Sequence, residues 1–289
     1  KAFDRRHVFG LAEDHFVELD FGDLGRPRRA TLFLTGWIRP SGTSMNVAIS
    51  QNPELKSPAP PALWVPDKDG QWREALPYMG FPGGKTKTIA VDLSGVFLTD
   101  DYRVRIATNM EIYWDDAFIT VDEKPAEVRQ TPLRLVAADL HYRGFSLRTA
   151  DAEHGPEHYD YDRPSTATKW PAMGGHFTRY GDVRELLTAG DGMLAVLGAG
   201  DEVSLRFAVP DEPLPAGWKR DFVLYNVGWD KDCDLNTIYG ETVEPLPFAT
   251  TDGYTYDAAA QVHDRAKYER YLRTYQNRRQ DRAAFWRAH

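Results

Sequence analysis

The sequence contains very little cysteine: Cys233 is the only one in 289 residues. A single thiol cannot form a disulfide within the chain, and it cannot supply the paired spacing of a Cys-x-x-Cys motif or of a haem-attachment site. A scaffold held together by internal disulfides is therefore excluded, as is a covalently attached haem. The cysteine content leaves the cellular compartment open.

The sequence also lacks long apolar runs and the short motifs of several enzyme classes. No apolar run approaches the roughly 18–20 residues that a membrane-spanning helix needs, so no transmembrane segment is expected. There is no Gly-x-Ser-x-Gly elbow, Walker loop or dinucleotide-binding fingerprint. The first residue is Lys1 and not an initiator Met. We therefore expect a processed or excised piece of a longer product, whose targeting segment is missing.

The composition is that of a folded protein with an uneven charge. Hydrophobic residues make up 42% and aromatic residues 12% of the chain, which excludes disorder. Residues 261–289 hold eight basic and three acidic residues, a net charge of +5, which leaves −13 on the rest of a chain whose total is −8. An acidic body does not suit nucleic acid, because binding to phosphate needs positive charge. A basic tail suggests docking onto this body or onto an acidic neighbour.

The first half of the sequence has the rhythm of short strands. Residues 15–21 alternate apolar and polar, residues 30–38 form a β-rich run, and residues 44–50 are expected to form another strand. The sequence Asp67-Lys68-Asp69-Gly70 predicts a hairpin turn. Turn signals at intervals of about eight to twelve residues favour a sandwich or jelly roll. We predict such a domain over residues 1–125, with a strand rhythm similar to that of galactose-binding domains.

A charged, proline-containing stretch at residues 122–132 is the candidate linker to a second domain. We predict a second β-sandwich over residues 130–250, which makes the fold class mainly β. It contains a long polar loop, residues 148–175, of a length that is often functional. Further strands are expected at residues 193–197, 202–209 and 220–227.

The end of the sequence, residues 255–289, is expected to be a basic helical tail. Asp257 stands where an N-cap would, and few helix breakers follow it. Aromatic residues recur with the spacing of one helix face, and two more near the end suggest an anchor into a groove. For the tyrosines a packing seam is the alternative. The candidate partner-docking residues are Tyr268, Tyr271, Tyr275, Phe285 and Trp286.

Several strings of the sequence resemble one protein family. They are Gly175–Leu187 (GHFTRYGDVRELL), Leu214–Phe222 (LPAGWKRDF), Gly228–Asp232 (GWDKD), Val243–Phe248 (VEPLPF) and Arg103–Trp114 (RVRIATNMEIYW). Over roughly residues 85–250 the chain resembles the C-terminal region of large bacterial secreted proteins with FG-GAP/VCBS-type propeller repeats and an ASPIC/UnbV segment, some with tetratricopeptide repeats. The resemblance implies an extracytoplasmic location and an adhesion, scaffold or carbohydrate-contact role. The propeller repeats are absent, so the chain corresponds to the terminal module alone.

An acidic stretch in the second half is the best candidate for a metal site. Its candidate ligands are Asp230, Asp232, Asp234, Asn236 and Glu241. Oxygen ligands at loop positions 1, 3, 5 and 7, with a carboxylate at position 12, suit Ca²⁺. Leu235, however, occupies the position where such a loop needs glycine. A solvated acidic strand end with local turns is the alternative interpretation.

Aromatic residues beside acidic ones are the best candidates for a ligand site. Exposed tryptophan next to aspartate offers stacking and hydrogen bonding, which suits sugars, although most tryptophans pack in cores. The candidate ligand-binding residues are Trp114, Asp115, Asp116 and Trp229. A glycosidase would need a carboxylate pair, and Glu111, Asp115, Asp116 and Glu202 are the candidates for it. Their separation decides the mechanism, and the sequence does not give it.

These patterns favour a noncatalytic, extracytoplasmic binding or scaffold module that contacts protein partners within a larger protein or assembly. The alternative is a carbohydrate-binding module that uses aromatic and acidic loop residues, with or without Ca²⁺. A glycan-active hydrolase is the third hypothesis, because no catalytic constellation is recognisable in the sequence.

Calcium binding at the acidic stretch is tested by thermal unfolding with and without the ion. If the carboxylates bind Ca²⁺, millimolar calcium raises the melting temperature, because a ligand that binds only the folded state stabilises it. The Asp232→Ala and Asp234→Ala variants then abolish the increase. The absence of any shift in the unaltered chain favours the solvated acidic turn.

Overall fold

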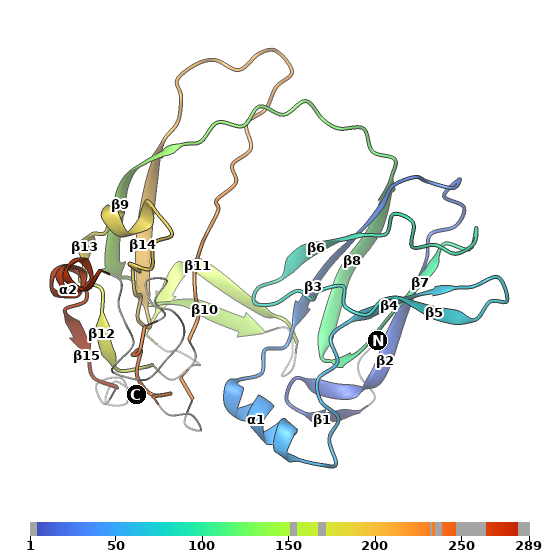
Figure 1. Ribbon diagram of the computed structural model, residues 1–289, viewed down its shortest axis with the longest axis horizontal. Coiled ribbons are helices and arrows are strands. Elements are labelled where there is room, and N and C mark those ends of the chain that lie inside the picture. Colours follow the sequence, from blue (N-terminus) through green and yellow to red (C-terminus); the bar gives the residue numbers. More distant parts are fainter. Residues whose placement is uncertain are drawn as a thin grey trace. The chain divides into compact units, whose positions relative to one another are not determined.

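The structure, a computed structural model, describes residues 5–150, 155–166, 172–231, 233–234, 239–246 and 264–282 (Figure 1). The described residues are mainly β, with 40% strand and 10% helix. The chain divides into two compact units. The first comprises Lys1–Val128 and Arg148–His158, and the second comprises Arg129–Leu147 and Tyr159–His289.

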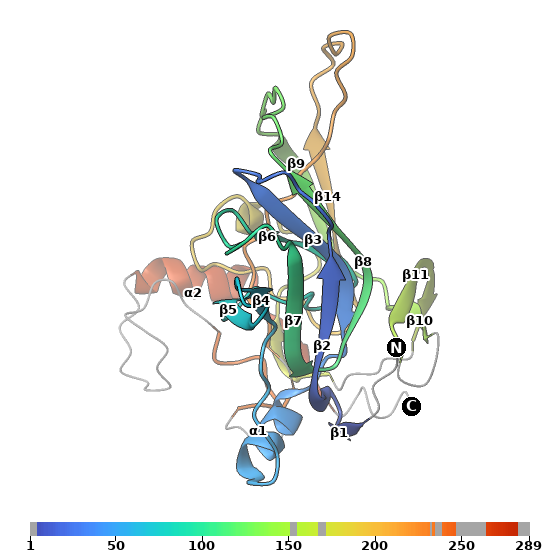
Figure 2. The same cartoon turned by 90° about the vertical axis from the view of Figure 1, so that its right-hand side faces the viewer.

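The first unit contains two antiparallel sheets (Figures 1 and 2). The five-stranded sheet has the order β1 (Arg6–Val8), β2 (Leu11–Asp20), β7 (Arg103–Met110), β4 (Ala62–Pro66) and β5 (Trp72–Leu76). The three-stranded sheet has the order β6 (Lys87–Asp92), β3 (Ala30–Ile38) and β8 (Ile112–Val121). The chain passes from one sheet to the other between β7 and β8.

One apolar core lies between strands of these two sheets. Leu32 and Leu34 of β3 are at most 1% exposed, as are Val104 and Ile106 of β7, and all four belong to the same buried cluster. Each pair is separated by two positions because successive side chains of a strand point to opposite faces. Burying a side chain of this size contributes about 1.5–3 kcal/mol, so the alternating pattern selects the register of both strands.

The prediction of a strand at residues 44–50 was wrong. This segment is part of helix α1 (Thr43–Gln51), in which Ile49 is buried and Met45, four residues earlier, is half-buried. Apolar residues at positions 45, 47 and 49 fit the period of a strand, while 45 and 49 also fit one helix face. A run this short cannot be assigned by periodicity alone.

The second unit is built on a three-stranded antiparallel sheet and a short helix (Figure 1). The sheet has the order β13 (Gly181–Asp182), β9 (Arg134–Tyr142) and β14 (Asp201–Ala208), with the 3₁₀ helix η1 (Arg184–Leu187) after β13. A separate pair joins β12 (Gly175–Phe177) to β15 (Arg278–Gln280). Helix α2 (Arg265–Thr274) supplies Tyr271 to the buried cluster that contains Leu140 of β9. Neither α-helix in the described residues is long and apolar enough to cross a membrane.

Three predictions for the second half of the chain need correction. The expected loop over residues 148–175 contains the end of β10 (Phe145–Ala150) and all of β11 (Glu157–Ser165), which form a two-stranded sheet. Residues 193–197 form no strand, because side chains bind their backbone: Tyr271 Oη donates to Leu194 O, and Val196 N donates to Thr178 Oγ1. Residues 220–227 also form no strand.

The prediction of a tail that is helical throughout was also wrong. The described helix begins after Asp264, whose side chain accepts a hydrogen bond from Lys267 N at 2.9 Å. It ends at Thr274, and Arg278–Gln280 form strand β15 because they pair with β12. Asp257, the expected N-cap, lies outside the described residues.

A buried carboxylate stands where the chain leaves β7 for β8. Glu111 is 0% exposed, and its Oε1 accepts hydrogen bonds from Arg6 Nε at 2.9 Å and from Tyr113 Oη at 2.7 Å. Arg39, which is 5% exposed, places its Nε 3.3 Å from the same oxygen. The Arg39 guanidinium also lies over the ring of Phe9. One carboxylate therefore compensates two arginines at this edge of the first unit.

The Glu111→Gln variant is expected to destabilise the first unit by about 3–5 kcal/mol, because it leaves the guanidinium of Arg39 buried without a counter-charge. Urea unfolding measures the effect as a lower transition midpoint. Glu18→Gln is the matched control: Glu18 forms an exposed pair with Arg105 at 3.0 Å, and loss of a surface pair costs about 0–1 kcal/mol. Equal midpoint shifts in the two variants would contradict the role of Glu111 as the buried counter-charge of Arg39.

Candidate functional site

The segment that follows β14 exposes an unusual number of apolar side chains. Residues 209–230, here called the apolar arm, form neither helix nor strand, and every one of them is exposed. Val223 is 94% exposed and Tyr225 is 85% exposed. Its large apolar side chains are Val209, Leu214, Trp218, Phe222, Val223, Leu224, Tyr225, Val227 and Trp229. Contiguous apolar surface of this kind marks an interaction site in a folded protein.

The local sequence explains why the first part of the apolar arm is extended. Pro210, Pro213 and Pro215 have fixed backbone angles and no N–H to donate. Trp218 N donates to Pro215 O at 3.0 Å across a turn in which Gly217 has a φ of 82°. In the described part of the chain, this is the only backbone-to-backbone hydrogen bond that the apolar arm makes.

The second part of the apolar arm has the composition of a strand without the pairing of one. From Phe222 to Val227 the side chains are aromatic or aliphatic except for Asn226, and such residues favour strands. Their backbone donors and acceptors have no ladder partner among the described residues. The arrangement can therefore offer both apolar side chains and free backbone groups to another sheet.

The four predicted ligand-binding residues are divided between the two units. Trp229 is 48% exposed and belongs to the apolar arm of the second unit. Trp114 is half-buried against the core of the first unit, and Asp115 and Asp116 are exposed on β8. A Cβ at Gly36 of β3 would come within 2.8 Å of the Trp114 ring, so the close approach of the two strands requires glycine there.

The acidic stretch does not form a cluster in the described residues. Asp230 is exposed, Asp234 is 3% exposed, and Glu241 forms an ion pair with Arg282. Two other predicted ligands, Asp232 and Asn236, lie outside the described residues. Within residues that the structure describes, no three His, Cys, Asp or Glu side chains are grouped to hold a metal ion. Calcium binding therefore stays a prediction.

A polar cavity of about 690 Å³ lies between β12, β15 and residues 241–244. Both the backbone N and the Nδ1 of His176 lie within hydrogen-bond distance of Glu244 Oε1, at 2.8 and 2.9 Å. Burial raises the pKa of Glu244, but hydrogen bonds from Thr242 and His176 outweigh burial and hold that pKa below its ordinary value. Lys231 Nζ donates to the carbonyls of Thr242 and Glu244, and burial lowers its pKa. These contacts bind the segment around Glu244 to β12.

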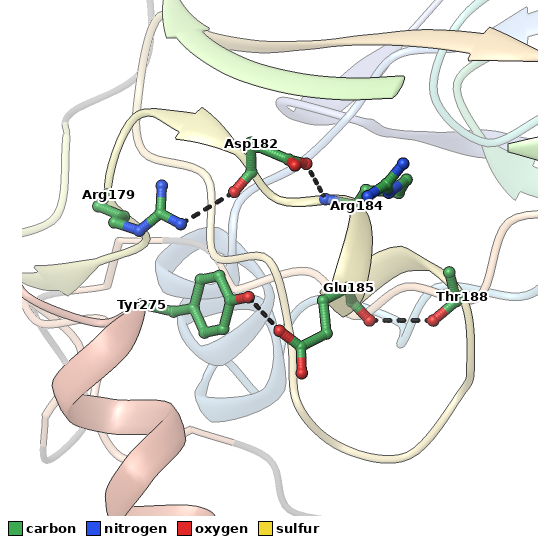
Figure 3. A pocket seen from close by; sticks show the side chains of 6 residues that line it. All are labelled: Arg179, Asp182, Arg184, Glu185, Thr188 and Tyr275. Carbon is green, nitrogen blue, oxygen red and sulfur yellow. Dashed lines mark hydrogen bonds between the residues drawn. The ribbon is translucent and has the colours of Figure 1, made fainter. Parts of the chain in front are cut away.

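A smaller cavity of about 430 Å³ lies where α2 meets η1 (Figure 3). Tyr275 Oη donates to the carboxylate of Glu185, which raises the pKa of Tyr275. Arg179 stacks over the Tyr275 ring at 5.0 Å and donates to the carbonyls of Tyr180 and Asp182 at 3.0 and 3.1 Å. Figure 3 shows these side chains pointing toward one another. The polar side chains that line this cavity already form hydrogen bonds with one another or with nearby backbone groups. The cavity therefore marks the contact between α2 and η1.

The predicted partner-docking tyrosines pack inside the second unit. Tyr271 is 3% exposed and Tyr275 is 9% exposed, and Tyr268 packs against the same cluster. Tyr271 Oη donates to Leu194 O at 2.8 Å, and buried Gln276 donates to the same carbonyl. Tyr271 and Tyr275 are therefore packed inside this unit and are not available on its surface, while Tyr268 is half-buried beside them. Phe285 and Trp286 lie outside the described residues.

Two of the carboxylates considered for a glycosidase are held in ion pairs. Glu111 is buried with Arg6 and Arg39. Glu202 lies 3.0 Å from Arg143 Nε and 3.3 Å from His141 Nε2. These arrangements give each carboxylate a structural role.

Of the apolar arm, the sequence pointed only to Trp229 and Asp230 as site residues and did not identify the arm as a whole. Residues 220–227 look like a strand from their composition, and the sequence does not reveal that no neighbouring strand pairs with them. The closely spaced prolines at 210, 213 and 215 were the one signal that set this segment apart. Comparison of the chain with protein-family models, curated proteins and solved structures gave no match.

Alkaline pH is expected to destabilise the second unit through its buried tyrosines. Burial raises the pKa of Tyr268 from 10.0 to about 12, and it raises the pKa of Tyr271 as well. A group whose pKa is higher in the folded chain than in the unfolded chain adds to the free energy of unfolding. Its full contribution is present at pH values below its unfolded pKa. That stability is lost as the pH rises from about 10 to about 12. Tyrosinate absorbance and circular dichroism are expected to change together in this window.

The Tyr271→Phe variant is the control for this prediction, since it removes one of the titrating groups. Its stability is expected to fall less steeply with pH than that of the unaltered chain. A second unit whose urea midpoint is constant from about pH 9 to about pH 12 would contradict the role of buried tyrosines.

Proposed function

We propose that the chain is a noncatalytic binding module that contacts a protein partner through the apolar arm. The observation that carries the proposal is the exposure of nine large apolar side chains over residues 209–230. Each would gain about 1.5–3 kcal/mol from full burial, so covering even a few of them favours association strongly. Apolar patches on folded proteins are characteristic of sites that bind other macromolecules.

The backbone of the apolar arm favours a protein as the partner. Residues 219–230 make no backbone-to-backbone hydrogen bond with any described residue. An extended segment with free N–H and C=O groups can add a strand to the edge of another sheet, where pockets then receive alternate side chains. The side chains of Phe222 and Leu224 would face one side of that sheet, and those of Val223 and Tyr225 the other.

Ion pairing of two of the four candidate catalytic carboxylates supports a noncatalytic role. Glu111 is buried between two arginines, and Glu202 is paired with Arg143. Glu111 is 0% exposed and has no access to a substrate, whereas Glu202 is partly exposed but bound to Arg143 and His141. The hydrolase hypothesis would therefore rest on other residues.

Carbohydrate binding is the second candidate function, and the exposure of Trp229 favours it. The Trp229 side chain is 48% exposed beside exposed Asp230, which places a ring for stacking next to a hydrogen-bond acceptor. Sugars are recognised by this combination. We place this second to protein binding, because the neighbouring apolar residues Val223 and Val227 offer nothing that a sugar requires.

The finer description of the fold is part of the same proposal. We infer that the first unit is a β-sandwich of the jelly-roll kind, because its two antiparallel sheets share one core cluster. The family resemblance supports an extracytoplasmic location for a module of this kind. It also supports the view that the module works within a larger protein or assembly.

The proposed function is tested by photo-crosslinking. A chain that carries a photo-crosslinking residue in place of Tyr225 is irradiated in an extract of the cells that make it. We expect a discrete protein adduct, because Tyr225 lies within the proposed contact. The matched control carries the same group in place of Tyr78, which is 61% exposed in the first unit, and is expected to give no such adduct.

Two outcomes would count against the proposal. Equal adducts from both positions would indicate nonspecific contact. The absence of any adduct at Tyr225, together with a positive glycan-array signal that Trp229→Ala abolishes, would favour the carbohydrate-binding alternative.

A further inference from the structure

Strand β14, which precedes the apolar arm, has one edge that pairs with no strand in the part of the chain that the structure describes. It pairs with β9 from Asp201 to Ala208 and with no other described strand. An edge strand presents a row of unpaired N–H and C=O groups, which act as a template for an added strand. Beside this edge Leu205 is 36% exposed and Phe207 is half-buried. The second unit therefore contains an acceptor for one more strand.

The same unit also contains a segment suited to be that strand. Arg220–Val227 has the aromatic and β-branched composition of a strand, is exposed along its whole length and forms no ladder with any described strand. Donor and acceptor are thus both present in one polypeptide, and among the described residues neither has a strand to pair with on the side in question.

The connection between donor and acceptor is too long for a tight hairpin, and the structure does not pair the two within one chain. Tight hairpins use connections of about two to five residues, whereas residues 209–219 separate Ala208 from Arg220 here. Three prolines make the beginning of this connection stiff and extended. In Figure 1 the orange coil first continues beyond the end of β14 and then turns back, without pairing with it.

We propose that the partner of the apolar arm is a second copy of this chain. Residues 220–227 of each copy add a strand to the β14 edge of the other copy, and the exchange is reciprocal. This inference rests on the proposed function and names the partner of the same site. Exchange of an identical element between protomers is a low-cost route to a dimer, because each contact uses a surface that the fold already contains.

The reciprocal exchange accounts for both unusual features of the second unit at once. It supplies ladder partners to the backbone of the apolar arm and to the open edge of β14. It also covers Leu205 of one copy with apolar side chains such as Phe222 or Leu224 of the other. A partner without a sheet edge would satisfy only the side chains of the arm.

The oligomeric state of the purified full chain tests the inference first. Size-exclusion chromatography with light scattering is expected to show a dimer that dissociates on dilution. The double variant Val223→Pro, Leu224→Pro is expected to weaken the dimer at least tenfold, because one of two neighbouring residues in a strand directs its N–H toward the strand it pairs with, and proline has no N–H to donate. Val223→Thr is the matched control, since it keeps the N–H and the branched side chain, and it is expected to retain the dimer. Circular dichroism should show both variants folded, because the side chains of Val223 and Leu224 are exposed.

Crosslinking with isotope labels identifies the strand that is contacted. Chains with the photo-crosslinking residue at Tyr225 are mixed with ¹⁵N-labelled chains that lack it. Peptides that join an unlabelled arm to residues 201–208 of a labelled chain would support the exchange. Crosslinks to β14 of the same copy, or a monomer at every concentration, would overturn it.

The outcomes also separate this inference from the function on which it rests. A monomeric chain whose arm crosslinks to a different protein in an extract would remove the second copy as partner and leave the proposed function standing. A monomeric chain whose arm forms no adduct with any protein would remove both.

Discussion

The second unit depends on a buried ion pair that joins two segments far apart in the sequence. Asp201, at the start of β14, has a fully buried side chain and pairs with Arg278 at the start of β15. Tyr180 Oη and Gly198 N donate to the same carboxylate at 2.9 and 2.7 Å. Arg278 in turn donates to Thr178 O at 2.8 Å. A buried carboxylate needs this degree of compensation, because an unpaired one would cost about 3–5 kcal/mol.

The ion pair explains why the C-terminal segment is part of the unit. By fixing Arg278, it holds β15 against β12 and keeps α2 close to the sheet. Tyr271 then completes the buried cluster around Leu140 of β9. The basic character of the tail, which suggests a surface for an acidic neighbour, is thus partly used within the chain. The apolar arm starts at the other end of β14, so a strand fixed at its beginning carries an arm that is exposed along its whole length.

The sequence was sufficient for the parts of the fold that local interactions decide. Residues 30–38 were predicted as a strand and form β3, because a regular alternation of buried side chains leaves one register. The turn at Asp67–Gly70 was also predicted. It forms because Asp67 Oδ1 accepts hydrogen bonds from the backbone N of Asp69 and Gln71, which are close in sequence. Both signals depend only on residues close in sequence.

The errors arise where the partner of a segment lies far along the chain. Residues 193–197 have strand composition, but Thr178, Tyr271 and Gln276 take up their backbone hydrogen bonds. Residues 220–227 have the same composition and no partner among the described residues. The candidate site could not be derived from the sequence for this reason. The solvent exposure of a segment depends on which other parts of the chain pack against it, and the composition of the segment does not determine this.

The two units are interleaved along the sequence, which limits where the chain can be divided. Arg148–His158 belong to the first unit, although the residues on either side belong to the second. The polypeptide therefore changes unit after residues 128, 147 and 158. Recombination at any single breakpoint would separate residues that fold together. Each unit, although it has its own core, is therefore assembled from two separate stretches of the sequence.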